Sequence, residues 1–177
     1  MIFGAKYASY CLIPAFKNSG LVKVVGICSP SEINRKLAAK THNINKTFSN
    51  FEDALKETNF NIAAIAVPPS FQKDIALKCI NNGIHIFAEK PLTTNLKSAK
   101  LLLRKSERKN IKTAVDFLFP ETITWKKAKK LISNNQIGNL HHLIVNWNVE
   151  SFDNRQKIKT WKTNSKLGGG SFSHFGS

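Results

Sequence analysis

Apolar, β-branched runs alternate with helix-like segments along the first two thirds of the chain. Within the runs the apolar residues are consecutive, as in the buried strands of a parallel sheet. Between the runs they recur every three or four residues, as in helices that bury one face. Strands joined by helices of this length predict an α/β fold with a doubly wound parallel sheet. The predicted strands are residues 1–3, 22–28, 62–67, 84–88 and 113–117, and the predicted helices are 8–18, 31–41, 51–57, 71–82 and 95–109.

The pattern changes after residue 118. A helix is predicted from Pro120 to about Asn134, and residues 141–149 alternate between apolar and polar, as in a strand with one exposed face. We interpret residues 1–118 as one nearly complete domain and residues 119–177 as the opening of a second α/β domain. The first strand is short, and the glycine-rich stretch at the end leads to no further element, so the chain looks truncated at both ends.

The composition is that of a globular protein, with 177 residues of which 42% are hydrophobic. No run of about 18 uncharged apolar residues occurs, so a membrane-spanning helix is not expected. The opening residues lack the basic and apolar regions of a secretory signal. Cys11, Cys28 and Cys79 lie far apart without metal-ligand spacing. We therefore expect reduced thiols in a cytoplasmic protein, with no disulfide framework and no metal site.

The net charge of +16 is high for this length. Clusters such as Lys126-Lys127 and Lys129-Lys130 alternate with apolar residues at helical spacing, which is typical of the solvated face of an amphipathic helix. Attraction to a polyanion or to an anionic cofactor is the alternative. Neither a recognition helix, nor a zinc pair, nor a basic strand with interleaved aromatic residues is visible, so nucleic acid is not an expected partner.

The first ligand signal is the segment Gly4–Ser9, because ligands of open α/β sheets bind at the carboxyl ends of the strands. Its spacing matches G-x-G-x-x-G/A, with Lys6 in the second glycine position and Ser9 in the third. The second glycine normally lets the pyrophosphate of a dinucleotide approach the backbone, whereas a lysine offers it charge. A strand–turn–helix corner also needs a glycine without any cofactor, so both interpretations stay open.

The second signal follows the next strand, where Ser29 stands in the place of the acid that would accept both ribose hydroxyls of NAD. Arg35 and Lys36 come one turn into the following helix, within reach of a ribose 2′-phosphate. This pattern favours NADP over NAD. The alternative is that both are ordinary charges on a helix surface.

The third signal is Glu89-Lys90-Pro91, directly after a buried strand. Pro91 keeps Lys90 out of helical geometry, so the lysine is held at the carboxyl edge of the sheet. A lysine near a nicotinamide orients substrate hydroxyls and tunes proton transfer. A surface lysine at a helix entry is the equally weighted alternative.

Together these motifs resemble the Gfo/Idh/MocA family of NAD(P)-dependent oxidoreductases, and the resemblance covers the whole chain. The segments that carry it are Gly4–Ser9 with Ile13-Pro14-Ala15-Phe16, Val67-Pro68-Pro69-x-x-Gln72, Phe87–Leu92, Ile137–Leu140, Trp161-Lys162 and Gly168–Gly170.

The resemblance implies an N-terminal dinucleotide-binding Rossmann domain followed by an α/β domain whose open, mostly antiparallel sheet covers the nicotinamide. In this family that sheet often makes the oligomer interface, so a homo-oligomer is implied for the full-length form. Hydride passes between the nicotinamide, here of NADP or NAD, and a hydroxyl-bearing carbon of a sugar, cyclitol or related polyol.

The resemblance also implies which residues form the site. Lys90 corresponds to the family lysine that contacts substrate and cofactor. The family has an Asp after the glycines and an acid/base His four residues later; here His174 stands at the Asp position, and the His position is one past Ser177. His174 is thus the remaining acid/base candidate. The implied cofactor contacts are Gly4, Ala5, Lys6, Tyr7, Ala8, Ser29, Arg35, Val67, Pro68, Gln72, Glu89, Lys90, Trp161 and Lys162.

We therefore expect an NAD(P)-dependent dehydrogenase of which this chain is a fragment with little activity. The alternative is a non-catalytic dinucleotide-binding or interaction module, in which Lys6 and His174 mark a lost active site.

Overall fold

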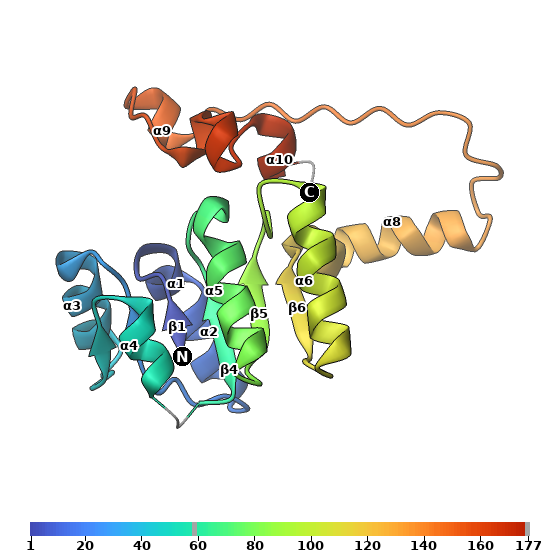
Figure 1. The fold of residues 1–177 in the computed structure, drawn as a ribbon. Helices are drawn as coiled ribbons and strands as arrows, with labels where there is room; N and C mark the ends of the chain where they lie inside the picture. Colours follow the sequence, from blue (N-terminus) through green and yellow to red (C-terminus); the bar gives the residue numbers. More distant parts are fainter. Residues whose placement is uncertain (58–59, 176–177) are drawn as a thin grey trace.

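The computed structural model describes residues 1–57 and 60–175, and all strand pairs within them are parallel. The six strands form one sheet in the order β3-β2-β1-β4-β5-β6 (Figure 1). The order reverses between β1 and β4, as in a doubly wound fold, so the predicted fold class is confirmed. The strands are β1 (Ile2–Phe3), β2 (Ile27–Cys28), β3 (Thr47–Phe48), β4 (Ile62–Ile65), β5 (His85–Glu89) and β6 (Thr113–Asp116).

Helices cover both faces of the sheet. One core cluster joins Ile2, Ile27 and Ala64 to the first three helices, and the other joins Phe3 and Ile65 to the next three. The consecutive apolar residues of β4 fill both clusters, which is why this strand shows no alternation in the sequence. The helices of this part are α1 (Lys6–Tyr10), α2 (Leu12–Ser19), α3 (Glu32–Thr41), α4 (Phe51–Lys56), α5 (Pro69–Asn81) and α6 (Leu96–Arg108).

Three helices begin where a capping side chain directs them to begin. The Ser31 hydroxyl accepts a hydrogen bond from the Asn34 N–H, and the side chain of Asn50 accepts one from the Asp53 N–H. The Asn95 side chain does the same at the start of α6. Each bond satisfies an N–H that the first turn of a helix leaves without an intrahelical acceptor.

The C-terminal part of the chain lies beside and above this sheet. After the helix that ends at Ser133, residues 134–139 turn, and residues 140–150 then run extended to a group of short helices that sits above the carboxyl ends of the strands (Figure 1). The elements are α7 (Leu118–Glu121), α8 (Ile123–Ser133), α9 (Phe152–Arg155), the 3₁₀ turns η1 (Trp161–Thr163) and η2 (Ser165–Leu167), and α10 (Ser171–Phe175). No helix in the described part of the chain combines the length and hydropathy needed to cross a bilayer.

The predicted strand over residues 141–149 is wrong, because this segment pairs with no strand in the described residues. An extended segment becomes a strand only when a neighbour supplies the hydrogen bonds. Its apolar side chains stay exposed, with Leu143 at 70% and Val145 at 62%. Only Trp147 has a ring contact, with Phe119 at 5.2 Å between centroids.

Two other predicted elements differ in length or continuity. The helix predicted over 8–18 is divided between α1 and α2 at Cys11, because Pro14 has no N–H to donate to Tyr10 and its ring crowds that carbonyl. The strand predicted over 22–28 shortens to β2, since β1 offers it only Ile2 and Phe3 as partners. The pairing that forms β3 was not predicted from its polar, two-residue sequence.

We expect the exposed apolar stripe of Leu143, Val145 and Trp147 to cause self-association. Substituting Leu143→Asp and Val145→Asp together removes this stripe and lowers concentration-dependent association in sedimentation velocity runs. Replacing the equally exposed apolar Ile33 of α3 (81% exposed) by Asp is the matched control and leaves association unchanged. A compact monomer whose 141–149 amides exchange slowly would contradict the expectation.

Candidate functional site

The candidate site lies along the carboxyl edge of the sheet, where all six parallel strands end together. The point at which strand order reverses, between β1 and β4, is the place where open α/β sheets bind ligands. The group of short helices from residue 151 onward lies above this edge (Figure 1). The site therefore has a floor made by the strand ends and a partial cover made by the C-terminal segment.

The chain leaves β1 through Gly4, whose backbone fits where no side chain would. Its φ of +103° favours glycine, and a Cβ atom there would lie 2.2 Å from the Ala66 carbonyl oxygen. Its N–H donates to the Cys28 carbonyl oxygen at 2.8 Å, and the Ala66 N–H donates to the Phe3 carbonyl oxygen at 2.7 Å. This close approach leaves the first turn of α1 open toward the edge of the sheet.

The two helices that flank the reversal point lack the side-chain caps found elsewhere. α1 begins after Ala5 and α5 begins after Pro68, and neither residue supplies a side-chain acceptor to its helix. At the start of α1 the first N–H groups therefore have no side-chain acceptor, and such groups are the kind that receives phosphate oxygens. Lys6, the first residue of α1, is exposed beside them. At the start of α5, by contrast, Pro69 has no N–H and the Phe71 N–H donates to the Pro68 carbonyl oxygen at 2.9 Å.

At the end of β2, the Arg35 guanidinium folds back onto the chain. Its Nη1 donates to the Ser29 carbonyl oxygen at 2.5 Å, and Ser29 is buried. Burial raises the pKa of the neighbouring Cys28 thiol to about 11, although the Arg35 charge opposes the shift. Lys36, by contrast, is exposed and pairs with Glu32 at 2.5 Å. Of the two predicted phosphate ligands, the structure places Arg35 at the strand end and Lys36 on the outer helix surface.

The buried side-chain amide of Gln72 supports the turn after β5. The Lys90–Pro91 peptide bond is cis, and the Pro91 carbonyl oxygen accepts a hydrogen bond from Gln72 Nε2 at 2.8 Å. Gln72 is only 1% exposed. The Gln72 Nε2 atom therefore supports the turn that carries Lys90. The predicted contact of Gln72 with a cofactor stays a prediction.

Charged and phenolic groups from three elements meet at this turn. Glu89 and Asp116 are register partners at the ends of β5 and β6, so their side chains lie on the same face. Burial raises the pKa of Glu89 to about 7, helped by its hydrogen bond with Asp116 and the charge of that carboxyl. Burial also raises the pKa of Tyr7 on α1, with Glu89 adding to the shift. Burial lowers the pKa of Lys90, and the nearby carboxylates oppose that shift.

Three buried polar atoms at this edge lack a hydrogen-bond partner among the described residues. They are Ser70 Oγ, Gln72 Oε1 and Glu89 Oε1. Leaving a buried polar atom unsatisfied costs about 1–3 kcal/mol, so such atoms mark places where a ligand supplies the missing bond. The carboxamide and ribose hydroxyls of a nicotinamide nucleotide carry suitable donors, so the residues present fit this group.

The C-terminal segment packs against the edge of the sheet at Gly168. Gly168 is buried, and a Cβ on it would lie 2.9 Å from Pro69 Cβ and 3.3 Å from Thr94 Cγ2. The same segment brings the Lys162 charge near Lys90, where it helps to lower the pKa of Lys90, while Lys162 itself pairs with Asp153 at 3.5 Å. Trp161 is half-buried in η1.

The remaining predicted residues divide between the edge and the core. Val67 is half-buried at the end of β4, whereas Ala8 is fully buried and packs α1 onto the sheet. His174 belongs to α10, and its side chain lies outside the described residues. Sequence reasoning missed Asp116, although the run Thr113–Asp116 ends in an acid after apolar residues, as His85–Glu89 does.

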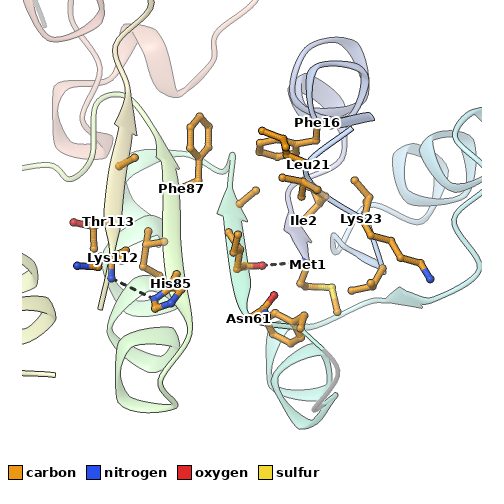
Figure 2. Close-up of a pocket in the computed structure, with 18 residues that line it drawn as sticks. Met1, Ile2, Phe16, Leu21, Lys23, Asn61, His85, Phe87, Lys112 and Thr113 are labelled. Carbon is orange, nitrogen blue, oxygen red and sulfur yellow. Dashed lines mark hydrogen bonds between the residues drawn. The ribbon is translucent and has the colours of Figure 1, made fainter. Parts of the chain in front are cut away.

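A separate apolar cavity of about 470 Å³ lies away from this edge. Its lining comes from the starts of β1, β4, β5 and β6 and from residues 21–25, and Figure 2 shows Phe16, Phe87 and Leu21 around it. The polar contacts there are structural: the Met1 amine donates to the Ile62 carbonyl oxygen at 2.9 Å. No group of metal-ligating side chains occurs in residues 1–57 and 60–175.

We predict that Gly4→Ala is far more destabilising than Gly83→Ala. Both glycines have positive φ, but a Cβ at Gly83 meets open space, whereas at Gly4 it meets the Ala66 carbonyl. Backbone strain alone accounts for about 1 kcal/mol at Gly83, and the clash adds about 2 kcal/mol or more at Gly4. Urea unfolding of both variants measures the difference, and equal losses would contradict the geometry.

We predict a pH-dependent stabilisation by Glu89→Gln. The folded-state pKa of Glu89 is raised to about 7, so the folded protein binds more protons than the unfolded chain between about pH 4.5 and 7, and stability falls as pH rises through that window. Glutamine removes this loss. The variant should melt with the wild type at pH 5 and about 2–4 °C above it at pH 8.

The exposed carboxylate of Glu107 on α6 offers the control for that comparison. Glu107→Gln should leave the melting temperature unchanged at both pH values. A Glu89→Gln variant that melts lower at pH 8 than at pH 5, relative to wild type, would show that the carboxylate is stabilising instead.

Two family profiles match this chain. The family profile described as an oxidoreductase family with an NAD-binding Rossmann fold matches residues 1–117. The profile described as the C-terminal alpha/beta domain of the oxidoreductase family matches residues 129–177.

Individual relatives extend over most of this chain. Glucose-6-phosphate 3-dehydrogenase from Bacillus subtilis is 27% identical over 175 residues, which are 98% of this chain and 48% of the relative. Oxidoreductase P35 from Formosa agariphila is 28% identical over 165 residues, which are 91% of this chain and 51% of the relative. The chain spans about half the length of the curated relatives it matches.

Among solved structures, scyllo-inositol dehydrogenase from Lactobacillus casei with bound NAD(H) and scyllo-inositol has a similar fold. The TM-score is 0.68 at 20% identity, covering 78% of this chain and 41% of the other. The parallel sheet, the Gly4 turn and the profile match over residues 1–117 lead to one conclusion: this chain belongs to the Gfo/Idh/MocA oxidoreductase family, with an NAD-binding Rossmann fold.

Proposed function

We propose that this chain binds a nicotinamide dinucleotide along the carboxyl edge of its sheet and takes part in NAD(P)-dependent oxidation or reduction of a polyol. The observation that carries the proposal is the position of Glu89-Lys90 at the end of β5, on the same edge as the Gly4 turn. A phosphate site and a partly buried lysine on one edge are the two parts that hydride transfer to a nicotinamide requires.

The half of the sheet made by β1 to β3 would bind the adenosine half of the cofactor, and the half made by β4 to β6 would bind the nicotinamide half. The pyrophosphate lies at the Gly4–Lys6 turn, and the adenosine ribose lies near Ser29 at the end of β2. Arg35 offers its charge to a ribose 2′-phosphate, which favours NADP over NAD. The ends of β4, β5 and β6 would hold the nicotinamide half, where Glu89 Oε1 has no hydrogen-bond partner within residues 1–57 and 60–175.

The bound nicotinamide supplies the carbon that accepts or donates hydride. Lys90 donates hydrogen bonds that orient the substrate hydroxyl, and burial lowers its pKa, which makes it a better proton donor to the reacting oxygen than an exposed lysine. His174 is our second acid/base candidate, because α10 lies above the same edge (Figure 1). Trp161 and Lys162 on η1 complete the cofactor contacts from above.

For the domain organisation, we propose residues 1–118 as the dinucleotide-binding domain and residues 119–177 as the beginning of a substrate and oligomerisation domain, the whole protein acting as a homo-oligomer. Sugars, cyclitols and related polyols are the proposed substrates, since the names of the relatives include a glucose-6-phosphate 3-dehydrogenase and a scyllo-inositol dehydrogenase. Because residues 141–149 form no sheet over the edge, we expect this chain alone to turn over little.

Fluorescence titration with NADPH and NADH tests the proposal. We expect NADPH to bind more tightly, and Arg35→Ala to weaken NADPH binding about tenfold while NADH binding stays within about twofold, because a charge-assisted hydrogen bond contributes about 1.5–3 kcal/mol. Lys40→Ala, an exposed lysine on the same helix, is the control. A preference for NADH would contradict the cofactor assignment, and absence of binding by either would contradict the function.

A further inference from the structure

The end of the nicotinamide half of the edge carries two carboxyl groups that touch. Glu89 and Asp116 are register partners on adjacent parallel strands, and their carboxyls are within hydrogen-bonding reach of each other. Both side chains are only partly exposed. Two ionised carboxylates in contact offer acceptors but no donor, so the pair is favourable only when it holds a proton.

The hydrogen bonds around Glu89 leave one of its carboxyl oxygens available for that proton. Glu89 Oε2 accepts from the Lys90 N–H at 3.2 Å, whereas Glu89 Oε1 is buried and receives no hydrogen bond in the described part of the chain. A single proton on the pair supplies the missing donor. The pair carries one negative charge when it holds this proton and two when it does not.

The groups around the pair come from every element packed against it. Tyr7 on α1 and Lys90 after β5 interact with both carboxyls, while Cys11 contacts Tyr7 and Lys162 of η1 acts on Lys90. Burial of the pair, together with the Asp116 contact, puts the titration of Glu89 near neutral pH, at a pKa of about 7. The pair thus changes charge within the physiological range, at the end of the sheet assigned to the nicotinamide.

The oxidised nicotinamide ring carries a positive charge and the reduced ring carries none. We propose that Asp116, through its contact with Glu89, is a specificity-determining residue that makes this site select the oxidised over the reduced cofactor as the pair loses its shared proton. The proposal rests on the proposed function, because it requires a nicotinamide over β5 and β6. It adds a role for Asp116 and a proton linked to cofactor binding.

The proton balance of this selection is simple. When NAD⁺ binds to the singly protonated pair, the positive ring favours the doubly charged form, and one proton passes to solvent. When NADH binds, its neutral ring exerts no such pull, and the proton stays between Glu89 and Asp116. Affinity for NAD⁺ therefore rises with pH through the titration of the pair, whereas affinity for NADH does not follow.

The test is the ratio of the NADH to the NAD⁺ dissociation constant, measured by calorimetry at pH 6 and pH 8. Effects of pH that act equally on both cofactors cancel in this ratio. In the wild type we expect the ratio to rise about five- to tenfold between the two pH values, toward preference for NAD⁺. Glu89→Gln removes the titrating carboxyl, so the ratio should stay within about twofold. In Asp116→Asn burial still raises the pKa of Glu89, but the hydrogen bond and charge of Asp116 no longer add to it, so the rise in the ratio should be clearly smaller than in the wild type.

Asp74→Asn is the matched control, because Asp74 is an exposed carboxylate of α5 that pairs with Lys73 at 3.3 Å. It should keep the wild-type rise. Carboxyl ¹³C titration of the unliganded protein adds a readout without cofactor: the group titrating near pH 7 in the wild type should be lost in Glu89→Gln and should move to lower pH in Asp116→Asn. Circular dichroism establishes that each variant is folded.

Three results would overturn the inference. A wild-type ratio that does not change with pH would do so, as would an Asp116→Asn variant that keeps the rise. In both cases binding itself would leave the proposed function standing. If neither form of NAD nor of NADP binds at any pH, the proposed function fails and the inference fails with it.

Discussion

The close approach of the Gly4 turn to the end of β4 is the constraint on which the rest of the site depends. The Ala66 N–H donates to the Phe3 carbonyl and the Gly4 N–H donates to the Cys28 carbonyl, so β1 is tied on both sides at its last residue. With no room for a Cβ at Gly4, the chain turns at once into α1. The first turns of α1 and α5 are thereby brought beside the reversal point of the sheet.

The second feature of the edge is the free-energy cost of removing its charged groups from water. Glu89, Lys90 and Asp116 are partly buried, and burial shifts the pKa of Glu89 upward and of Lys90 downward, toward neutral forms. Desolvation thus outweighs the attraction between Lys90 and its neighbouring carboxylates. With a pKa of about 7, Glu89 exchanges its proton readily near neutral pH, which suits a reaction in which a hydroxyl proton leaves as hydride is transferred.

The C-terminal segment is placed over this edge by small residues and few contacts. Gly168 lets η2 approach Pro69 and Thr94, and Lys162 comes near Lys90. Between this group and α8, residues 134–150 cross the molecule without pairing. The core of the molecule therefore belongs to the sheet and its six flanking helices, and the later residues add a cover without a second core among the described residues.

The sequence by itself determined the elements of the first 118 residues and the edge at which chemistry gathers. Unbroken apolar runs specify buried parallel strands, and Ser31, Asn50 and Asn95 specify helix starts, because these effects act within a few residues. The break at Cys11 was equally local, and Pro14 carried its signal. Only the tertiary structure decided that residues 141–149 stay unpaired, that Gln72 supports the Pro91 turn, and that Asp116 meets Glu89. Those outcomes depend on which strands lie side by side and in what register, and hydrogen bonds between distant segments leave no periodic trace along the chain.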